Sequence, residues 1–551
     1  MTTIPRFHWW TNLALLVLGG LLALVFCGRR QSLTVKPRLP EDHGVLRVAY
    51  TPGLLPDPHR PLFPLSQYNE LILSLWEPLV ECDSLTNLPQ PAAAQGWEWS
   101  PDQRTLTLHL RPDARWSNGD LVTAHDFVRG WQRLLRQDIL LAQALFPLKN
   151  AEAYQQGRLK GIQSVGMHAV DDLTIRLELD HPCSTLVMEL ADPLLSPMHE
   201  TSGEVLETAG YFDKPEALVT NGPFRLSQAG QDGFRLEPNR YYHSHAAIRL
   251  AGVQFVRAGR PFLAPLMLAA GVVDLLSPMP FGPAKPFPTA RTVTLESELV
   301  LGVTCVDFNT SRAPLNDVRV RRALALALDR VAPIQKYDPG HMVPAWSWVP
   351  SMPGREGLAL LKEDAAEARR LLAEAGYPDG RGFPVLRLAM PLWGEGDPFP
   401  MAISEHWFQE LGVTVYLTYE SPGKMNTRVA TGDYDLLYGT LVATVPDASD
   451  LLSGFLQPLE YNTTKWINQE VVGLLNDANQ RTGAERFAAL EKAERALMAA
   501  VPSVPIMFER RQVMRGSEVH GWYVDALARQ NLKRLWLEPG LADPTTTKPA
   551  L

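Results

Sequence analysis

The stretch Thr105–Trp131 constrains what this chain can fold into more than any other. Leucine alternates with threonine or histidine from 105 to 110, which predicts a half-buried strand. A Ser-Asn-Gly-Asp turn follows at 117–120, where the glycine can adopt a positive φ. Thr123 is a predicted helix N-cap, and Asp126 stands at the capping-box position three residues later. The stretch therefore predicts a strand, a turn and a helix in that order.

A second informative stretch covers residues 314–330. Val320, Leu324 and Leu328 recur at helical spacing, which predicts a helix with one apolar stripe. The arginines at 319–322 would, taken alone, form a solvated face with no meaning for nucleic acid.

Both stretches resemble signatures of one family, the extracytoplasmic solute-binding proteins of oligopeptide and dipeptide ABC transporters (family 5). The first reads as R-x-x-x-x-W-x-(N/D)-G-x-x-(V/L)-T-A-x-D-(F/V), and the second as P-(F/L)-(D/N)-D-x-R-V-R-x-A-(L/I)-x-x-A-(I/L)-D-R. The resemblance covers about 44–537, with its motifs in order. Further matching segments are 91–102, 170–179 (read as one strand), 220–226, 235–242, 271–274, 362–377, 432–437 and 501–508.

Composition and motifs argue against several other classes of protein. A formal net charge of −8 argues weakly against nucleic-acid binding. Four cysteines lack CxxC spacing, so we expect no zinc or other metal site, and no cofactor. Enzyme signatures such as HExxH, GxSxG, GxGxxG and the P-loop do not occur. The pair His125-Asp126 is better explained as a helix N-terminus than as a catalytic pair, so we expect no enzyme.

The N-terminus predicts export. Leu13–Cys27 is apolar, two tryptophans precede it, and Arg29-Arg30 closes it. Three interpretations remain open: a signal peptide, an uncleaved helical anchor, or a lipoprotein signal with Cys27 as the lipidated residue. Phe26 is large for the position before a lipidated cysteine. We expect a protein tethered to the membrane on the extracytoplasmic, or periplasmic, side of a bacterial cell envelope.

The resemblance implies an α/β fold of the periplasmic binding protein type (class II, peptide-binding), with two main lobes, an additional inserted lobe and mixed sheets. Fourteen tryptophans should mostly fill cores, with Trp346 and Trp348 the least core-like. The expected domains are 1–30 signal or anchor, 31–43 linker, 44–80 with 205–300 and 510–540 as a discontinuous lobe I, 81–204 lobe II, 301–509 lobe III, and 541–551 a disordered tail.

The resemblance also implies a ligand-binding strand after the G-x-Y-D motif, here Leu436 to Thr444. Peptide-binding members continue with (A/G)-(G/S)-W-x-x-D, whose aspartate holds the ligand's α-ammonium. Leu441 replaces that tryptophan, Thr444 replaces that aspartate, and Asp447 follows three residues later. The candidate ligand-binding residues are Tyr68, Asn69, Asn221, Gly222, Trp346, Arg428, Tyr438, Gly439, Thr440, Leu441, Thr444 and Asp447.

The expected function is capture of peptides or a related small solute in the interlobe cleft, and delivery to an ABC permease with its ATPase. The alternative is a membrane-tethered sensor or scaffold that kept the fold without transport. We expect a monomer. Because a threonine cannot replace a carboxylate, and because Asp447 lies beyond Pro446, we also expect no selection for a free α-amino group.

Overall fold

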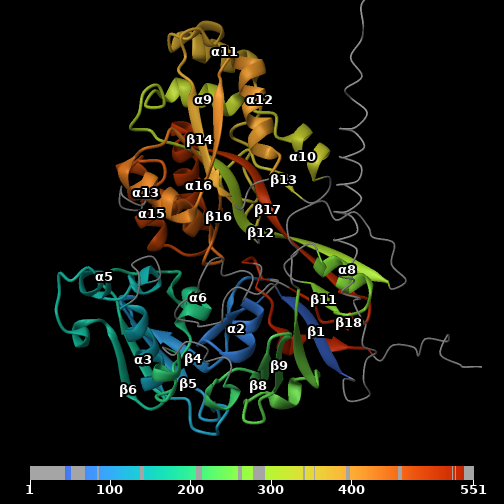
Figure 1. Ribbon diagram of the computed structural model, residues 1–551. Coiled ribbons are helices and arrows are strands. Elements are labelled where there is room, and N and C mark those ends of the chain that lie inside the picture. The colour runs from blue at the N-terminus through green and yellow to red at the C-terminus, as the bar shows by residue number, and fades with distance from the viewer. Residues whose placement is uncertain are drawn as a thin grey trace, which may run out of the picture.

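The computed structural model describes most of the chain as a lower part and an upper part (Figure 1). The apolar segment 13–27 with Cys27, the predicted linker, Tyr68 and the predicted tail 541–551 lie outside the described residues. Within the described part, no helix is long and apolar enough to cross a membrane. The described residues are 44–50, 69–83, 86–136, 142–206, 214–258, 263–276, 292–338, 342–352, 354–392, 397–456, 462–523, 525–527 and 529–538.

One mixed sheet runs through both parts. Its strands are β1 (Val45–Tyr50), β8 (Phe224–Gly230), β9 (Gly233–Pro238), β10 (Gly252–Arg257), β11 (Leu275–Leu276), β12 (Val293–Phe308), β13 (Val343–Pro344), β14 (Leu386–Pro391), β15 (Val415–Glu420), β16 (Leu436–Val442) and β17 (Ser503–Gly516). Their order is β15-β14-β16-β12-β17-β11-β1-β10-β9-β8, and β13 pairs with β17. β1 and β10 are parallel, whereas β12 and β17 are antiparallel. The expected mixed sheet is therefore confirmed.

The strands β12 and β17 cross from the lower part to the upper part (Figure 1). Leu299 lies opposite Arg510, and Val303 lies opposite Phe508, so residues 300–302 face Glu509 alone. Extra residues in one strand bend and twist an antiparallel pair. The two crossing strands are thus irregular at the junction of the two parts, where a hinge would act.

A smaller sheet contains the strand predicted at 105–110. It is formed by β4 (Ala94–Trp99), β5 (Thr105–Leu110), β7 (Thr174–Glu178) and β6 (Met167–Asp171), in that order. The three leucines of β5 are at most 1% exposed, which confirms the alternating strand. The helix α3 (Ala124–Leu134) follows with its capping box formed, and the Asp126 carboxylate also accepts from the Trp116 indole at 3.1 Å. The predicted single strand at 170–179 was wrong, because the chain turns at Asp172 into the hairpin β6–β7.

Helices pack around the sheets in both parts (Figure 1). In the lower part they are α2 (Asn69–Leu75), α5 (Ala151–Gln155), α6 (Leu186–Glu189), α7 (Ser202–Leu206) and α8 (Ala264–Ala269). In the upper part they are α9 (Val318–Leu326), α10 (Val331–Tyr337), α11 (Ala365–Glu374), α12 (Phe399–Leu411), α13 (Pro422–Thr431), α14 (Ala448–Ser453), α15 (Gln469–Asn479) and α16 (Gly483–Ala500). Short ladders complete the lower part: β2 (Val80–Cys82) with β3 (Pro89–Pro91), and β18 (Val519–His520) with β19 (Trp536–Leu537).

Two large clusters of buried residues match the two parts. One cluster runs from Leu46 to Leu535 and includes residues of both lobe I and lobe II as predicted. The other contains Leu301 to Phe508 and one residue beyond, Leu527. The predicted lobes I and II thus share a core, and the exact lobe boundaries stay a prediction.

Two predictions about single side chains of the upper part were wrong. Arg321 is 5% exposed, and its guanidinium donates to the carbonyl oxygens of Leu315, Ala500 and Val501 at 2.6–2.9 Å. The arginine run is therefore partly buried, because the last carbonyls of α16 need donors. Trp348 is 2% exposed and donates to the Leu451 carbonyl at 2.8 Å, so it is a core residue.

Candidate functional site

The strand β16 has an open edge near the junction of the two parts. All of its residues pair with β12, but on its other side pairing with β14 covers only Leu436 and Leu437. From Tyr438 to Val442 no described strand pairs with that side. Val442 lies opposite Gly302, and the Ala443 amide donates to the Leu301 carbonyl at 2.7 Å. The open edge therefore ends at the irregular part of the crossing strands.

Hydroxyl groups on β16 contact carboxylates, either directly or through a second hydroxyl. The Tyr438 phenol donates to Oδ2 of Asp397 at 2.9 Å. The Thr440 hydroxyl lies 2.7 Å from the Thr304 hydroxyl of β12, which in turn donates to the Glu509 carboxylate of β17. Sequence reasoning had predicted Tyr438 and Thr440 but missed their partners, which come from three distant segments with no motif of their own.

A carboxylate lies beside Thr444 that sequence reasoning also missed. Oδ2 of Asp450 accepts from the Thr444 amide at 2.5 Å, the Thr444 hydroxyl at 3.1 Å and the Val445 amide at 3.2 Å. Asp450 belongs to α14, and the turn before that helix brings it back to the end of β16. The only signal in the sequence was an acidic residue six positions after Thr444.

Asp447 already contacts other residues of the protein. Its Oδ1 caps α14 by accepting from the Ser449 amide at 2.8 Å, and it pairs with Arg486 of α16 at 2.7 Å. Asp447 is 6% exposed and Arg486 is likewise 6% exposed. A buried carboxylate that already holds a guanidinium is poorly placed to bind a ligand ammonium.

The surroundings of β16 are acidic. Burial raises the pKa of the carboxyls of Asp397, Glu509 and Asp450. Across the junction, burial raises the pKa of Glu189 of α6 to about 7, and Asp450 contributes to that shift. Such groups favour hydrogen-bond donors and cations as neighbours and disfavour anions.

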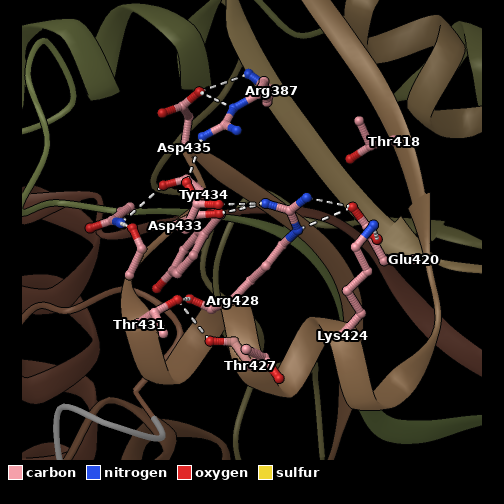
Figure 2. A network of polar contacts seen from close by, with 12 residues as sticks. Arg387, Thr418, Glu420, Lys424, Thr427, Arg428, Thr431, Asp433, Tyr434 and Asp435 are labelled. Carbon is pink, nitrogen blue, oxygen red and sulfur yellow. Dashed lines mark hydrogen bonds and ion pairs between the residues drawn. The ribbon is translucent and has the colours of Figure 1, made fainter.

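Arg428 lies in a separate network at the other end of β16 (Figure 2). Its guanidinium pairs with Glu420 at 2.8 Å and with Asp433 at 2.9 Å. Asp433 also pairs with Arg387 at 3.1 Å. Asp433 precedes the first residue of β16, whereas Val442 at the junction is its last. The predicted site residue Arg428 is therefore not brought together with Thr440 and Thr444.

The remaining predicted residues lie in other contacts. The Trp346 indole donates to the Glu363 carboxylate at 3.0 Å. Asn221 bonds through its side chain to the backbone of Glu77 at 2.8 and 3.0 Å. The Gly222 amide donates to the Leu75 carbonyl at 2.8 Å.

The two residues Asn221 and Gly222 fasten β8 to the end of α2. A Cβ on Gly222 would lie 2.5 Å from the Leu75 carbonyl carbon, so the close approach requires glycine. Asn69 is the first residue of α2, and the next residue, Glu70, pairs with Arg511 of β17. Gly439 and Leu441, by contrast, lie in the open edge of β16.

Comparisons with known proteins identify the family. Residues 89–463 match the family described as bacterial extracellular solute-binding proteins, family 5 Middle. A relative from Escherichia coli, the probable deoxycholate-binding periplasmic protein YgiS, is 31% identical over 462 residues, covering 80% of this chain and 83% of the relative. The oligopeptide-binding protein OppA of Bacillus subtilis is 28% identical over 438 residues, covering 76% of this chain and 79% of that protein.

Solved structures share the fold. The Haemophilus influenzae OppA complex with RPPGFSPFR has a TM-score of 0.72 at 26% identity, covering 90% of this chain and 99% of that one. The Escherichia coli murein tripeptide binding protein MppA has a TM-score of 0.73 at 25% identity, covering 90% and 98%. The expected class II periplasmic binding protein fold is thus confirmed, and the chain belongs to the bacterial extracellular solute-binding proteins of family 5.

Proposed function

We propose that this chain captures an extended peptide against the open edge of β16 and delivers it to an ABC permease. The observation that carries the proposal is one side of Tyr438–Val442, with which no strand among the described residues pairs and which ends at the bend of the crossing strands. An unpaired strand edge offers backbone amides and carbonyls to an added strand. The contacts we propose are Tyr438, Gly439, Thr440, Leu441 and Thr444.

The relatives support a peptide more than a bile acid. Several are named as oligopeptide- or dipeptide-binding proteins, although one is named as a probable deoxycholate-binding protein. An anionic bile acid would meet the carboxylates of Asp397, Glu509 and Asp450, which repel it. A peptide can donate its amide hydrogens to the same region.

The tether and the lobe boundaries are part of the proposal. Residues 1–30 would hold the protein to the membrane outside the cytoplasm, by lipid or by helix. The lobes would meet at 300/301 and 509/510, which coincides with the irregular pairing of β12 and β17. Deletion of residues 1–30 should release the protein from the membrane fraction. Wild-type protein found wholly in the cytoplasm would contradict this part of the proposal.

Calorimetry tests the ligand class. Full-length protein is titrated with trialanine, with longer alanine peptides and, as the competing ligand, with deoxycholate. We expect binding of at least one peptide and weaker or no binding of deoxycholate. Tight deoxycholate binding with no peptide binding would overturn the proposal.

A further inference from the structure

Three residues with side-chain hydroxyls lie along β16 and the residues that follow it: Tyr438, Thr440 and Thr444. Tyr438 donates to Asp397 and Thr444 donates to Asp450, at 2.9 and 3.1 Å. A hydroxyl has one proton to donate, and an ionised carboxylate can only accept. The protons of these two hydroxyls are therefore already used within the protein.

The hydroxyl proton of Thr440 is also used within the protein, because Thr304 links Thr440 to Glu509. Thr304 donates its single proton to Glu509, because the ionised carboxylate has none to give. The 2.7 Å contact between Thr304 and Thr440 then requires the proton of Thr440. Only lone pairs remain on the Thr440 oxygen for any other partner.

The direction of hydrogen-bond donation is set at Thr304, inside the protein, and then applies to Thr440 at the surface. Thr304 is 2% exposed, whereas Thr440 is exposed on the open-edged strand. Glu509 is the single β17 residue that faces residues 300–302. The series of hydrogen bonds that links Glu509, Thr304 and Thr440 therefore begins where the crossing strands bend. The Glu509 carboxylate therefore determines which way both hydroxyls point.

We propose that Thr440 and Thr444 determine specificity by offering a ligand only hydrogen-bond acceptors, so that N–H or O–H donors are selected along β16. Glu509 and Thr304 act as positioning residues for Thr440. This inference rests on the proposed function and adds which ligand groups the strand selects, namely hydrogen-bond donors. A neutral oxygen can accept from an amide N–H as well as from an ammonium, so this selection does not require a free α-amine.

Acid should relax the selection at Thr440. Burial raises the pKa of Glu509, and Asp397 before α12 and Asp338 after α10 raise it further, while Tyr438 of β16 also faces it. Once protonated, Glu509 can donate to Thr304, and the chain of hydroxyls can reverse. Thr440 would then be able to donate to an acceptor.

Neutron diffraction from crystals of the full-length protein at mildly alkaline pH tests the direction without any ligand. The expected map has one deuterium on the Thr440 oxygen directed at Thr304, and one on the Thr304 oxygen directed at Glu509. A deuterium on Thr304 directed at Thr440, or one on Glu509, would overturn the inference.

Calorimetry tests the selection. Trialanine is compared with its two backbone-ester analogues, which lack one N–H each, in wild type and in Thr440→Val. We expect one ester to bind wild type roughly threefold to tenfold more weakly, and less than about twofold more weakly in the variant. Effects of the ester other than the lost donor cancel in this comparison.

Two further variants separate direction from packing. Thr304→Val should reduce the ester penalty, Thr304→Ser should restore it, and acid should reduce it in wild type. An ester penalty that is equal in wild type and Thr440→Val would overturn the inference. Failure of trialanine and of every longer alanine peptide to bind wild type would count against the proposed function and the selection derived from it, whereas the neutron map decides the hydroxyl direction alone.

Discussion

At the scale of single residues, the sequence predicted which family feature is missing but not what stands in its place. The resemblance predicts that Thr444 stands where peptide-binding members of the family carry an ammonium-binding aspartate, and this difference is visible in the sequence. Asp450 could not be predicted, because only the turn into α14 brings it beside Thr444. The role of Asp447 was likewise decided by Arg486, a residue 39 positions away.

We expect wild-type protein to bind a peptide and its N-acetylated form with near-equal affinity. The acceptor at Thr444 is a neutral hydroxyl, whereas a carboxylate at this position would bind an α-ammonium more tightly by about 1.5–3 kcal/mol, or roughly ten- to a hundredfold in affinity. Calorimetry with matched peptide pairs measures the ratio, and Thr444→Asp should create a preference for the free amine. A wild-type loss of more than about tenfold on acetylation would refute this, and Asp450→Asn would then identify the carboxylate responsible.

Asp447→Ala should destabilise the fold without altering peptide selectivity. The substitution removes the cap of α14 and leaves Arg486 buried without its carboxylate, which costs roughly 3–5 kcal/mol. Urea unfolding measures the loss of stability, and calorimetry on the remaining folded protein measures binding. A large change in the acetylation ratio together with unchanged stability would show that Asp447 binds ligand.

At the scale of elements, local periodicity predicted strands and helices whose faces differ strongly in polarity. β5 and α3 formed as expected, because their apolar residues alternate or recur on one face. The hairpin β6–β7 was mistaken for one strand, since its turn, Asp171-Asp172-Leu173, is short and lacks glycine and proline. The burial of Arg321 was missed because the carbonyls it satisfies end a helix about 180 residues away.

Arg321→Met should lower the free energy of unfolding by about 3 kcal/mol or more. Three carbonyl oxygens, of Leu315, Ala500 and Val501, would lose a charged donor inside the protein. Chemical denaturation measures the difference. Arg319→Met is the matched control, because Arg319 is exposed on the same helix, and little change is expected there. Equal effects of the two substitutions would contradict the assigned role.

Glu189 of α6 should make stability depend on pH. Its pKa rises from 4.5 to about 7 on folding, because burial disfavours the charged form. The folded state therefore keeps a proton that the unfolded state loses between these values, and stability falls as pH rises through this window. Glu189→Gln should raise the melting temperature above pH 7 and change it little below the ordinary pKa. Glu200→Gln, at an exposed side chain, is the control; a benefit of Glu189→Gln that does not vary with pH would contradict this account.

At the scale of the whole molecule, the order of motifs predicted the family and the class of fold. It could not predict that lobes I and II share a core, because that depends on which faces meet in space. Nor could it identify the open edge of β16, which depends on how far β14 extends beside it. We propose that this edge and the irregular crossing strands act together to capture a solute.

Small-angle X-ray scattering tests this central claim most directly. Protein is measured alone and saturated with a peptide that calorimetry has shown to bind. We expect the radius of gyration to fall on binding, because closure about β12 and β17 would bury the peptide between the lobes. Thr440→Val, saturated with the same peptide, should show the same compaction at a weaker affinity. Tight peptide binding with no change in the scattering curve would contradict the account.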